Sequence, residues 1–212
     1  MPAQSVEWAN MEPSAETVTA VALGIGLAAS AGFRVFVPML VASIAAHLGV
    51  FPMQDGFSWL GSWPAMICLG TATVAEITAY YVPFVDNILD SITTPMAVGA
   101  GTVLLTSVLP IDSGMLKWTT GFIIGGGIAA TVQSGGVLVR LLSSSLTGGA
   151  ANPAVTTGEN AAAIGTSLLS LVIPLIVVPV LLVLIVMTIV FVRKRLSRAR
   201  RDRMELRGQG TG

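Results

Sequence analysis

The sequence predicts an all-α, polytopic helical membrane protein, and three observations support this prediction. Only 10% of its 212 residues are charged and 53% are hydrophobic, with a mean hydropathy of +0.82, whereas soluble domains carry about 25% charged residues. Long apolar stretches recur along the chain, and a dense basic cluster follows the last of them directly. This composition excludes a water-soluble globular domain.

The net charge of zero is the sum of two unlike regions. Residues 1–192 carry three basic side chains and nine acids, a net charge of −6, and residues 193–212 carry eight basic side chains and two acids, a net charge of +6. The chain therefore divides into an acidic N-terminal flank (1–16), a transmembrane domain (17–192) and a basic tail. By the positive-inside rule this tail is cytoplasmic, and its position beside the membrane predicts contact with anionic lipid and not with nucleic acid.

Five segments are candidates for crossing a bilayer, since about 30 Å of hydrocarbon requires roughly 20 helical residues. They are 18–46, 64–82, 95–109, 118–146 and 161–192. The first, fourth and fifth are too long for one upright helix, and the third is too short unless it begins inside the motif before it. Such lengths, with Pro38, Pro174 and Pro179 inside long segments, predict kinked or interrupted helices.

The number of crossings stays open between five and six. Five crossings place the acidic N-terminus outside the cell, and six place both termini in the cytoplasm. A chain of this length builds only a narrow path by itself, which is compatible with a homo-oligomer.

A weak internal similarity predicts two degenerate repeats. Residues 26–29 resemble residues 127–130, and an arginine follows each, Arg34 in the first case and Arg140 in the second. The first repeat would comprise about residues 17–110, and the second about residues 117–192. An odd number of crossings between them would make them inverted repeats, which are typical of transporters. The alternative is chance similarity between membrane helices rich in glycine and alanine.

Small residues four positions apart predict close helix packing. Gly24, Ala28 and Gly32 share one helical face, and Gly121, Gly125 and Ala129 share another. In lipid, small residues at this spacing let two helix backbones approach each other. The first set overlaps a G-x-G-x-x-A pattern, but the strand and crossover unit of a dinucleotide site are missing, so packing is the favoured interpretation.

Six charged residues in or beside the apolar segments are the candidates for a functional path. They are Arg34, Glu76, Asp86, Asp90, Arg140 and Glu159. An unpaired charge inside a membrane costs about 2.5–3.5 kcal/mol even on the mildest scale, so we expect these side chains to face the protein interior. The arginines would bind an anionic group and the acids would carry a coupling cation or proton. The alternative is a set of buried ion pairs that only fix helix register.

Residues 83–95, P-F-V-D-N-I-L-D-S-I-T-T-P, form the densest polar cluster in the transmembrane domain. Asp86 and Asp90 are four positions apart, so on a helix they share a face. Neighbouring carboxylates suit proton exchange or cation binding. The alternative is a short amphipathic surface helix capped by Asp86, with Pro95 starting the next segment.

Enzymatic activity is not predicted. The single histidine, His47, and the single cysteine, Cys68, exclude multi-histidine zinc and haem sites and CxxC metal sites. The G-x-S-x-G and H-E-x-x-H motifs do not occur in the sequence. We therefore expect no cofactor, no metal site and no catalytic residue.

Two stretches, G-L-A-A-S-A-G-F-R-V-F-V-P at 26–38 and the motif at 83–95, resemble signatures of a family of small bacterial multi-pass membrane proteins that carries only a domain-of-unknown-function label. The resemblance implies an all-helical domain in the bacterial inner membrane. It supplies no substrate. The sequence supports two hypotheses: a small transporter or channel for an ion, solute or lipid headgroup, or a non-transporting scaffold or accessory subunit.

Overall fold

The computed structural model describes residues 14–51, 53–82 and 85–176, together with positions 179–180, 183, 186–187 and 190. The side chains of Asp86 and Asn87 lie outside this description, as do the acidic flank up to residue 13 and the basic tail from residue 193. All regular structure within the described residues is helical. The all-α prediction is therefore confirmed for this part of the chain, whereas five to six crossings and two repeats stay predictions.

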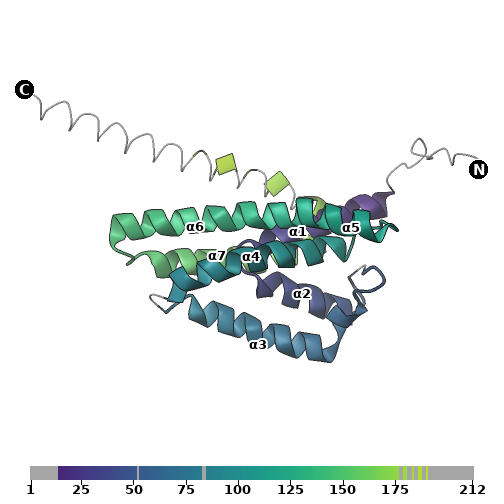
Figure 1. The fold of residues 1–212 in the computed structure, drawn as a ribbon, viewed down its shortest axis with the longest axis horizontal. Helices are drawn as coiled ribbons and strands as arrows, with labels where there is room; N and C mark the ends of the chain where they lie inside the picture. The colour runs from purple at the N-terminus through teal and green to yellow at the C-terminus, as the bar shows by residue number, and fades with distance from the viewer. Residues whose placement is uncertain are drawn as a thin grey trace, which may run out of the picture.

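The helices lie side by side in an elongated bundle (Figure 1). In chain order they are α1 (Ala15–Ala31), α2 (Phe36–His47), the 3₁₀-helix η2 (Ser58–Gly61), α3 (Trp63–Ala79), α4 (Val85–Thr106), α5 (Gly114–Thr120), the π-helix η3 (Gly121–Gly126), α6 (Gly127–Thr147) and α7 (Asn152–Val172). Among the described residues, two helical stretches are long and apolar enough to cross a membrane: Ile88–Thr106 and Gly114–Thr147.

The first apolar segment, 18–46, is interrupted, but it forms two antiparallel helices instead of one kinked span. α1 ends at Ala31, the chain turns through residues 32–35, and α2 begins at Phe36. Pro38 lies in the first turn of α2, where a backbone N–H has no helical partner, so it does not kink a helix.

Both outer ends of this α1–α2 hairpin lie at the same end of the bundle. In α1, a Cβ at Gly24 would lie 2.6 Å from Val108 Cγ2, just beyond the end of α4. After α2, the Gln54 amide donates to the Ser107 carbonyl over 2.8 Å, also beyond the end of α4. The turn between the two helices therefore points into the bundle from that end (Figure 1).

α4 corrects the interpretation of the 83–95 motif. Its helix runs without a break from Val85 to Thr106, and Pro95 lies inside it. The alternative of a separate surface helix followed by a new segment at Pro95 is therefore wrong. The third apolar segment, which was too short by itself, gains its length because the helix begins inside the motif.

α7 also differs from the segment expected at 161–192. It begins nine residues earlier, at Asn152, and ends at Val172. The following residue, Ile173, has φ −140° and ψ 67° and precedes Pro174. A proline disfavours the helical conformation in the residue before it, which explains the end of the helix.

Glycines bring α4 and the α5–η3–α6 rod into close contact. A Cβ at Gly101 would lie 2.6 Å from the Gly125 carbonyl oxygen, and one at Gly121 would collide with the Thr106 hydroxyl. Directly after α1, a Cβ at Gly32 would lie 2.5 Å from the Ala129 carbonyl oxygen. All six residues expected to pack helices together lie at buried positions, namely Gly24, Ala28, Gly32, Gly121, Gly125 and Ala129.

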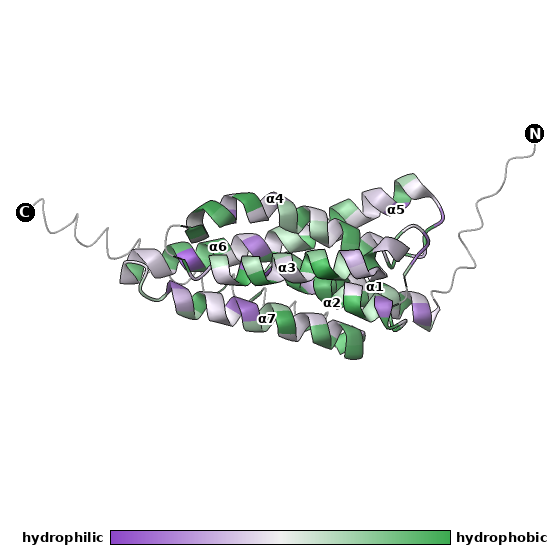
Figure 2. Cartoon of the chain, turned by 90° about the horizontal axis from the view of Figure 1, so that it is seen from below, coloured by the Kyte–Doolittle hydropathy of each residue, from purple (hydrophilic) through white to green (hydrophobic). Residues whose placement is uncertain are grey.

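α1 lies at the centre of the bundle and packs against α4, α7, α2 and α6. Its Leu23, Leu27 and Ala31 form a core with Leu104 and Ala129. Hydrophobic residues also occupy the outer faces of the helices (Figure 2). The polar side chains that position the candidate site are, by contrast, buried among the helices.

Candidate functional site

Four of the six predicted path residues meet in one cluster. The carboxylate of Glu159 lies between two guanidinium groups, with its Oε2 atom 3.0 Å from Arg34 Nη1 and 2.5 Å from Arg140 Nη2. Arg140 Nη1 pairs with Asp90 Oδ1. These four residues, here termed the charge network, come from the hairpin turn, α4, α6 and α7.

Arg34 is the best-anchored member of the charge network. It occupies the turn of the α1–α2 hairpin and is 1% exposed. Its Nε donates to Asn160 Oδ1 over 2.6 Å, and its Nη1 also donates to the Phe33 carbonyl over 2.9 Å. Asn160 follows Glu159 directly, so α7 supplies both the charge and the neutral acceptor that orient this guanidinium.

Tyr80, directly after α3, lies beside both arginines. Its ring centroid is 3.9 Å from Arg34 Cζ and 4.7 Å from Arg140 Cζ, within the range of cation–π attraction. Its hydroxyl donates to Asp90 Oδ1 over 3.1 Å and is 2.9 Å from Thr93 Oγ1. One side chain therefore contacts both arginines and one of the acids.

Glu76 lies next to the charge network, and its carboxylate binds backbone amides; its predicted role on a functional path stays a prediction. Its two carboxylate oxygens accept hydrogen bonds from the backbone amides of Val35 (2.8 Å) and Phe36 (3.0 Å). These amides open α2, where helical donors have no partner within the helix and the helix dipole favours a negative charge. Glu76 thus stabilises the hairpin turn that carries Arg34.

Asp86 lies one helical turn before Asp90 at the start of α4, and its side chain is outside the described residues. The structure therefore places its backbone close to the charge network but does not describe its interactions. The expectation that Asp86 and Asp90 act as a pair stays a prediction.

The charge network lies nearer one end of the bundle than its middle. Glu159 is seven residues after the start of α7, and Arg140 is seven residues before the end of α6. At 1.5 Å per residue this is about 10 Å from those helix ends. The ends concerned are opposite to the one from which the hairpin enters.

The charge network has one close contact with a helix backbone and one unused hydrogen-bond donor. Gly136 faces Glu159, and a Cβ there would lie 2.8 Å from Glu159 Oε1. Within the described residues, the buried Nε atom of Arg140 has no hydrogen-bond partner. The network is thus complete in charge, with two cations and two anions, but one guanidinium donor is unused.

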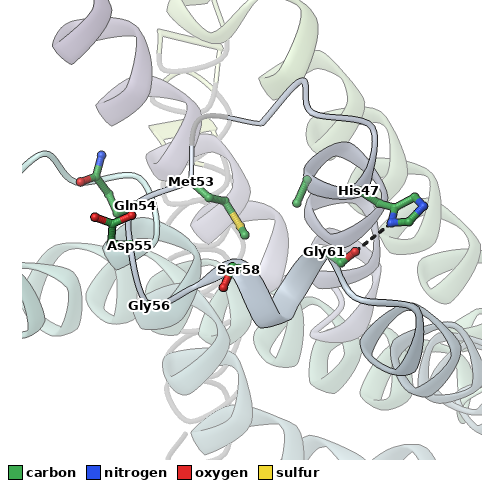
Figure 3. A pocket seen from close by; sticks show the side chains of 8 residues that line it. His47, Met53, Gln54, Asp55, Gly56, Ser58 and Gly61 are labelled. Carbon is green, nitrogen blue, oxygen red and sulfur yellow. Dashed lines mark hydrogen bonds between the residues drawn. The ribbon is translucent and has the colours of Figure 1, made fainter.

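A separate pocket of about 330 Å³ lies at the hairpin's entry end (Figure 3). Residues around the α2–α3 connection line it, including His47, Gln54 and Asp55. The His47 ring turns toward the Gly61 carbonyl, 2.9 Å from its Nδ1 atom. None of the six predicted path residues lines this pocket.

Sequence reasoning did not assign Tyr80 and Gln133 to the site. Gln133 Nε2 donates to Thr93 Oγ1 over 3.1 Å and thereby extends the polar cluster toward the start of α6. Both residues lie one or two helical turns from a predicted charged residue, Tyr80 four after Glu76 and Gln133 seven before Arg140. That spacing is the signal that identifies them.

The family model described as Domain of unknown function (DUF4126) matches residues 21–194. The chain belongs to this family. Its match includes every member of the charge network, and it confirms the family resemblance found in the sequence. No curated protein and no solved structure matches this DUF4126 chain.

Proposed function

We propose that this DUF4126 protein is a multi-pass protein of the bacterial inner membrane that moves an ion, a small solute or a lipid headgroup past the charge network. The distribution of side chains supports the membrane setting. Ile67, Val74, Phe122 and Ile123 are each more than 60% exposed, while Arg34 is 1% exposed. Soluble monomers rarely expose apolar surface on this scale, whereas lipid-facing helices require it.

The observation that carries the transport proposal is the α1–α2 hairpin. Its helices have 17 and 12 residues, enter from one end and return to it, and so place Arg34 at a turn within the bundle. Backbone that leaves helical geometry at membrane depth is tolerated where protein surrounds it, and transporters use such interruptions to build binding sites. Here the interruption faces Glu159, and α6 adds a second arginine from the other side of that carboxylate.

The accessory-subunit hypothesis has its own supporting observation. All four charges of the network are paired with one another, and their side chains are at most 13% exposed. Closed ion pairs of this kind fix helix register without any solute. As a transporter, the protein in this structure would be in an occluded state, and opening would have to separate at least one arginine from Glu159.

Flux through reconstituted vesicles tests the two hypotheses. Purified protein in liposomes would be assayed for proton movement with an enclosed pH dye, for labelled small anions and cations, and for headgroup-labelled lipid. The wild-type chain is expected to move at least one of these. Glu159→Gln, which removes the charge shared by both arginines, is expected to change the rate at least tenfold.

Glu16→Gln is the matched control, since Glu16 is an exposed carboxylate in the first turn of α1, remote in sequence from the turn at Arg34. It should leave the flux unchanged. If the wild-type chain moves no proton, ion or labelled lipid, and Glu159→Gln alters only thermal stability, the transport proposal is abandoned and the accessory-subunit hypothesis is retained.

A further inference from the structure

We propose that Arg34 and Arg140 form a site for a small carboxylate or phosphate group, and that the side-chain carboxylate of Glu159 occupies this site as a tethered anion. A free carboxylate or phosphate binds there when Glu159 takes up a proton and moves out of the site. This inference names a substrate class for the proposed transport function and rests on it for its physiological meaning. The binding site itself is argued from the contacts of the charge network.

The first argument is the arrangement of donors around one oxygen. Arg34 Nη1 and Arg140 Nη2 both donate to Glu159 Oε2, at 3.0 and 2.5 Å. Guanidinium forks match the geometry of carboxylate and phosphate oxygens better than any other side chain. Asn160 and the Phe33 carbonyl hold Arg34 in place, so this guanidinium is oriented independently of Glu159.

The second argument is the donor that Glu159 leaves unused. Arg140 is 5% exposed, and its Nε atom has no acceptor among the described residues. Nε and Nη2 form one edge of the guanidinium, and an anion with two free oxygens binds both atoms of such an edge. Glu159 reaches only Nη2, so a free carboxylate or phosphate would satisfy the guanidinium better than the resident side chain does.

The third argument is the close contact between the Glu159 carboxylate and the backbone of α6. Gly136 on α6 faces Glu159 Oε1, and even a single methyl group there would lie 2.8 Å from that oxygen. A side chain at position 136 would collide with the Glu159 carboxylate and push it out of its present position. Glycine at position 136 therefore allows the carboxylate to lie this close to α6.

Charge balance links the anion to a proton. The titratable and charged groups that face Glu159 or its partners are Arg34 in the hairpin turn, Glu76 and Tyr80 of the α3 region, Asp90 on α4 and Arg140 on α6. When a monovalent anion enters and a proton joins the Glu159 carboxylate, the net charge of the network is unchanged. Entry of the anion alone would bury an uncompensated negative charge. Binding therefore takes up one proton per monovalent anion.

The test measures anion binding to the purified full-length protein in detergent, with no membrane and no flux. Acetate, inorganic phosphate and short-chain phosphatidate would be titrated by calorimetry, with proton uptake followed by a pH indicator in weak buffer. The wild-type chain is expected to take up about one proton per acetate bound, and its affinity for acetate should therefore fall as the pH rises.

Glu159→Gln, which has the shape of the protonated side chain, is expected to bind the anion at least tenfold more tightly at pH 8 with no proton uptake. Adding Arg140→Gln should abolish this gain, and Glu16→Gln should match the wild type. Gly136→Ala keeps every charge and should tighten binding several-fold by displacing Glu159. This variant serves as the test if Glu159→Gln does not fold.

The outcomes distinguish a soluble anion from a lipid headgroup, and they test the anion site separately from the transport function. Binding of acetate or phosphate identifies a soluble anion, and binding of phosphatidate alone identifies a lipid headgroup. If no probe binds, or if neither Glu159→Gln nor Gly136→Ala binds more tightly than the wild type, the tethered-anion inference is overturned. Tight anion binding without vesicle flux supports the anion site and refutes the transport function. Proton or cation flux without anion binding supports transport and refutes the anion site.

Discussion

Replacing either of two glycines on α4 by alanine should change the stability of the fold, and the two changes should have opposite signs. Gly101 faces the α5–η3–α6 rod, and its Cβ would lie 2.6 Å from the Gly125 carbonyl oxygen and 2.7 Å from Ala129 Cβ. Ordinary contacts of this kind are 3.4–4 Å, so the two helices would have to separate by about 1 Å. Gly99 lies two residues away, is exposed, and has no atom within 4 Å of its Cβ position.

The magnitudes follow from two competing effects. Alanine gains about 0.5–1 kcal/mol over glycine within a helix, and overpacking a tight contact costs about 1–3 kcal/mol. Gly99→Ala should therefore stabilise the fold, and Gly101→Ala should destabilise it by about 1–2 kcal/mol. At about 2–4 °C per kcal/mol for a chain of this size, the two melting temperatures should differ by about 3–12 °C.

Thermal unfolding of both variants in one detergent, followed by the intrinsic fluorescence of the four tryptophans, measures this difference. Only helix propensity should act at Gly99, and only there should the melting temperature rise above that of the wild type. If Gly101→Ala melts at or above the temperature of Gly99→Ala, the close backbone contact between α4 and the rod is not part of the folded protein.

Three further predictions concern the hairpin and the charge network. Glu76→Gln replaces one carboxylate oxygen, an acceptor for the α2 amides, by an NH₂ donor. This should lower the free energy of unfolding by about 2–3 kcal/mol and the melting temperature by several degrees. The exposed Glu16→Gln should shift the melting temperature by less than about 1 °C. Tyr80→Phe keeps the ring beside both arginines but loses the hydrogen bond to the network, so a loss of about 1 kcal/mol is expected, again measured by thermal unfolding. Cysteines placed at Ser14 and Asp55 after replacement of the native cysteine should react with an impermeant reagent from the same side of the membrane, and labelling from opposite sides would show that the α1–α2 segment crosses.

The helical class and the identity of the charged residues follow from the sequence because both depend on local composition. A low charge content and long apolar runs leave helices as the main way to satisfy the backbone. Charged residues within those runs must find partners, and Arg34, Asp90, Arg140 and Glu159 do so with one another. Which acid meets which arginine depends on the packing of four helices, so sequence spacing does not determine it.

The reversal at residues 32–35 was beyond sequence reasoning for a physical reason. The apolar run continues across it, and the contacts that stabilise it are remote in sequence. Glu76 satisfies the amides of Val35 and Phe36 from 40 residues away, and Gly32 fits against Ala129 on α6. Pro95 is the converse case. A local rule predicts a helix start there, but α4 continues through it, and Thr93 and Ala97 on either side of the proline are buried in the bundle.

In the membrane setting that we propose, the rod formed by α5, η3 and α6 has a consequence for the bilayer around it. Its 34 residues span Gly114–Thr147, a length of about 50 Å at 1.5 Å per residue. Even at a 40° tilt such a rod covers about 39 Å along the membrane normal, more than the roughly 30 Å of hydrocarbon. At least about eight residues must then emerge into the headgroup layer, and the fraction that emerges grows as the bilayer thins. The tilt of the rod is therefore coupled to the thickness of the bilayer. Because α6 carries Arg140, a change in lipid chain length would also shift one member of the charge network.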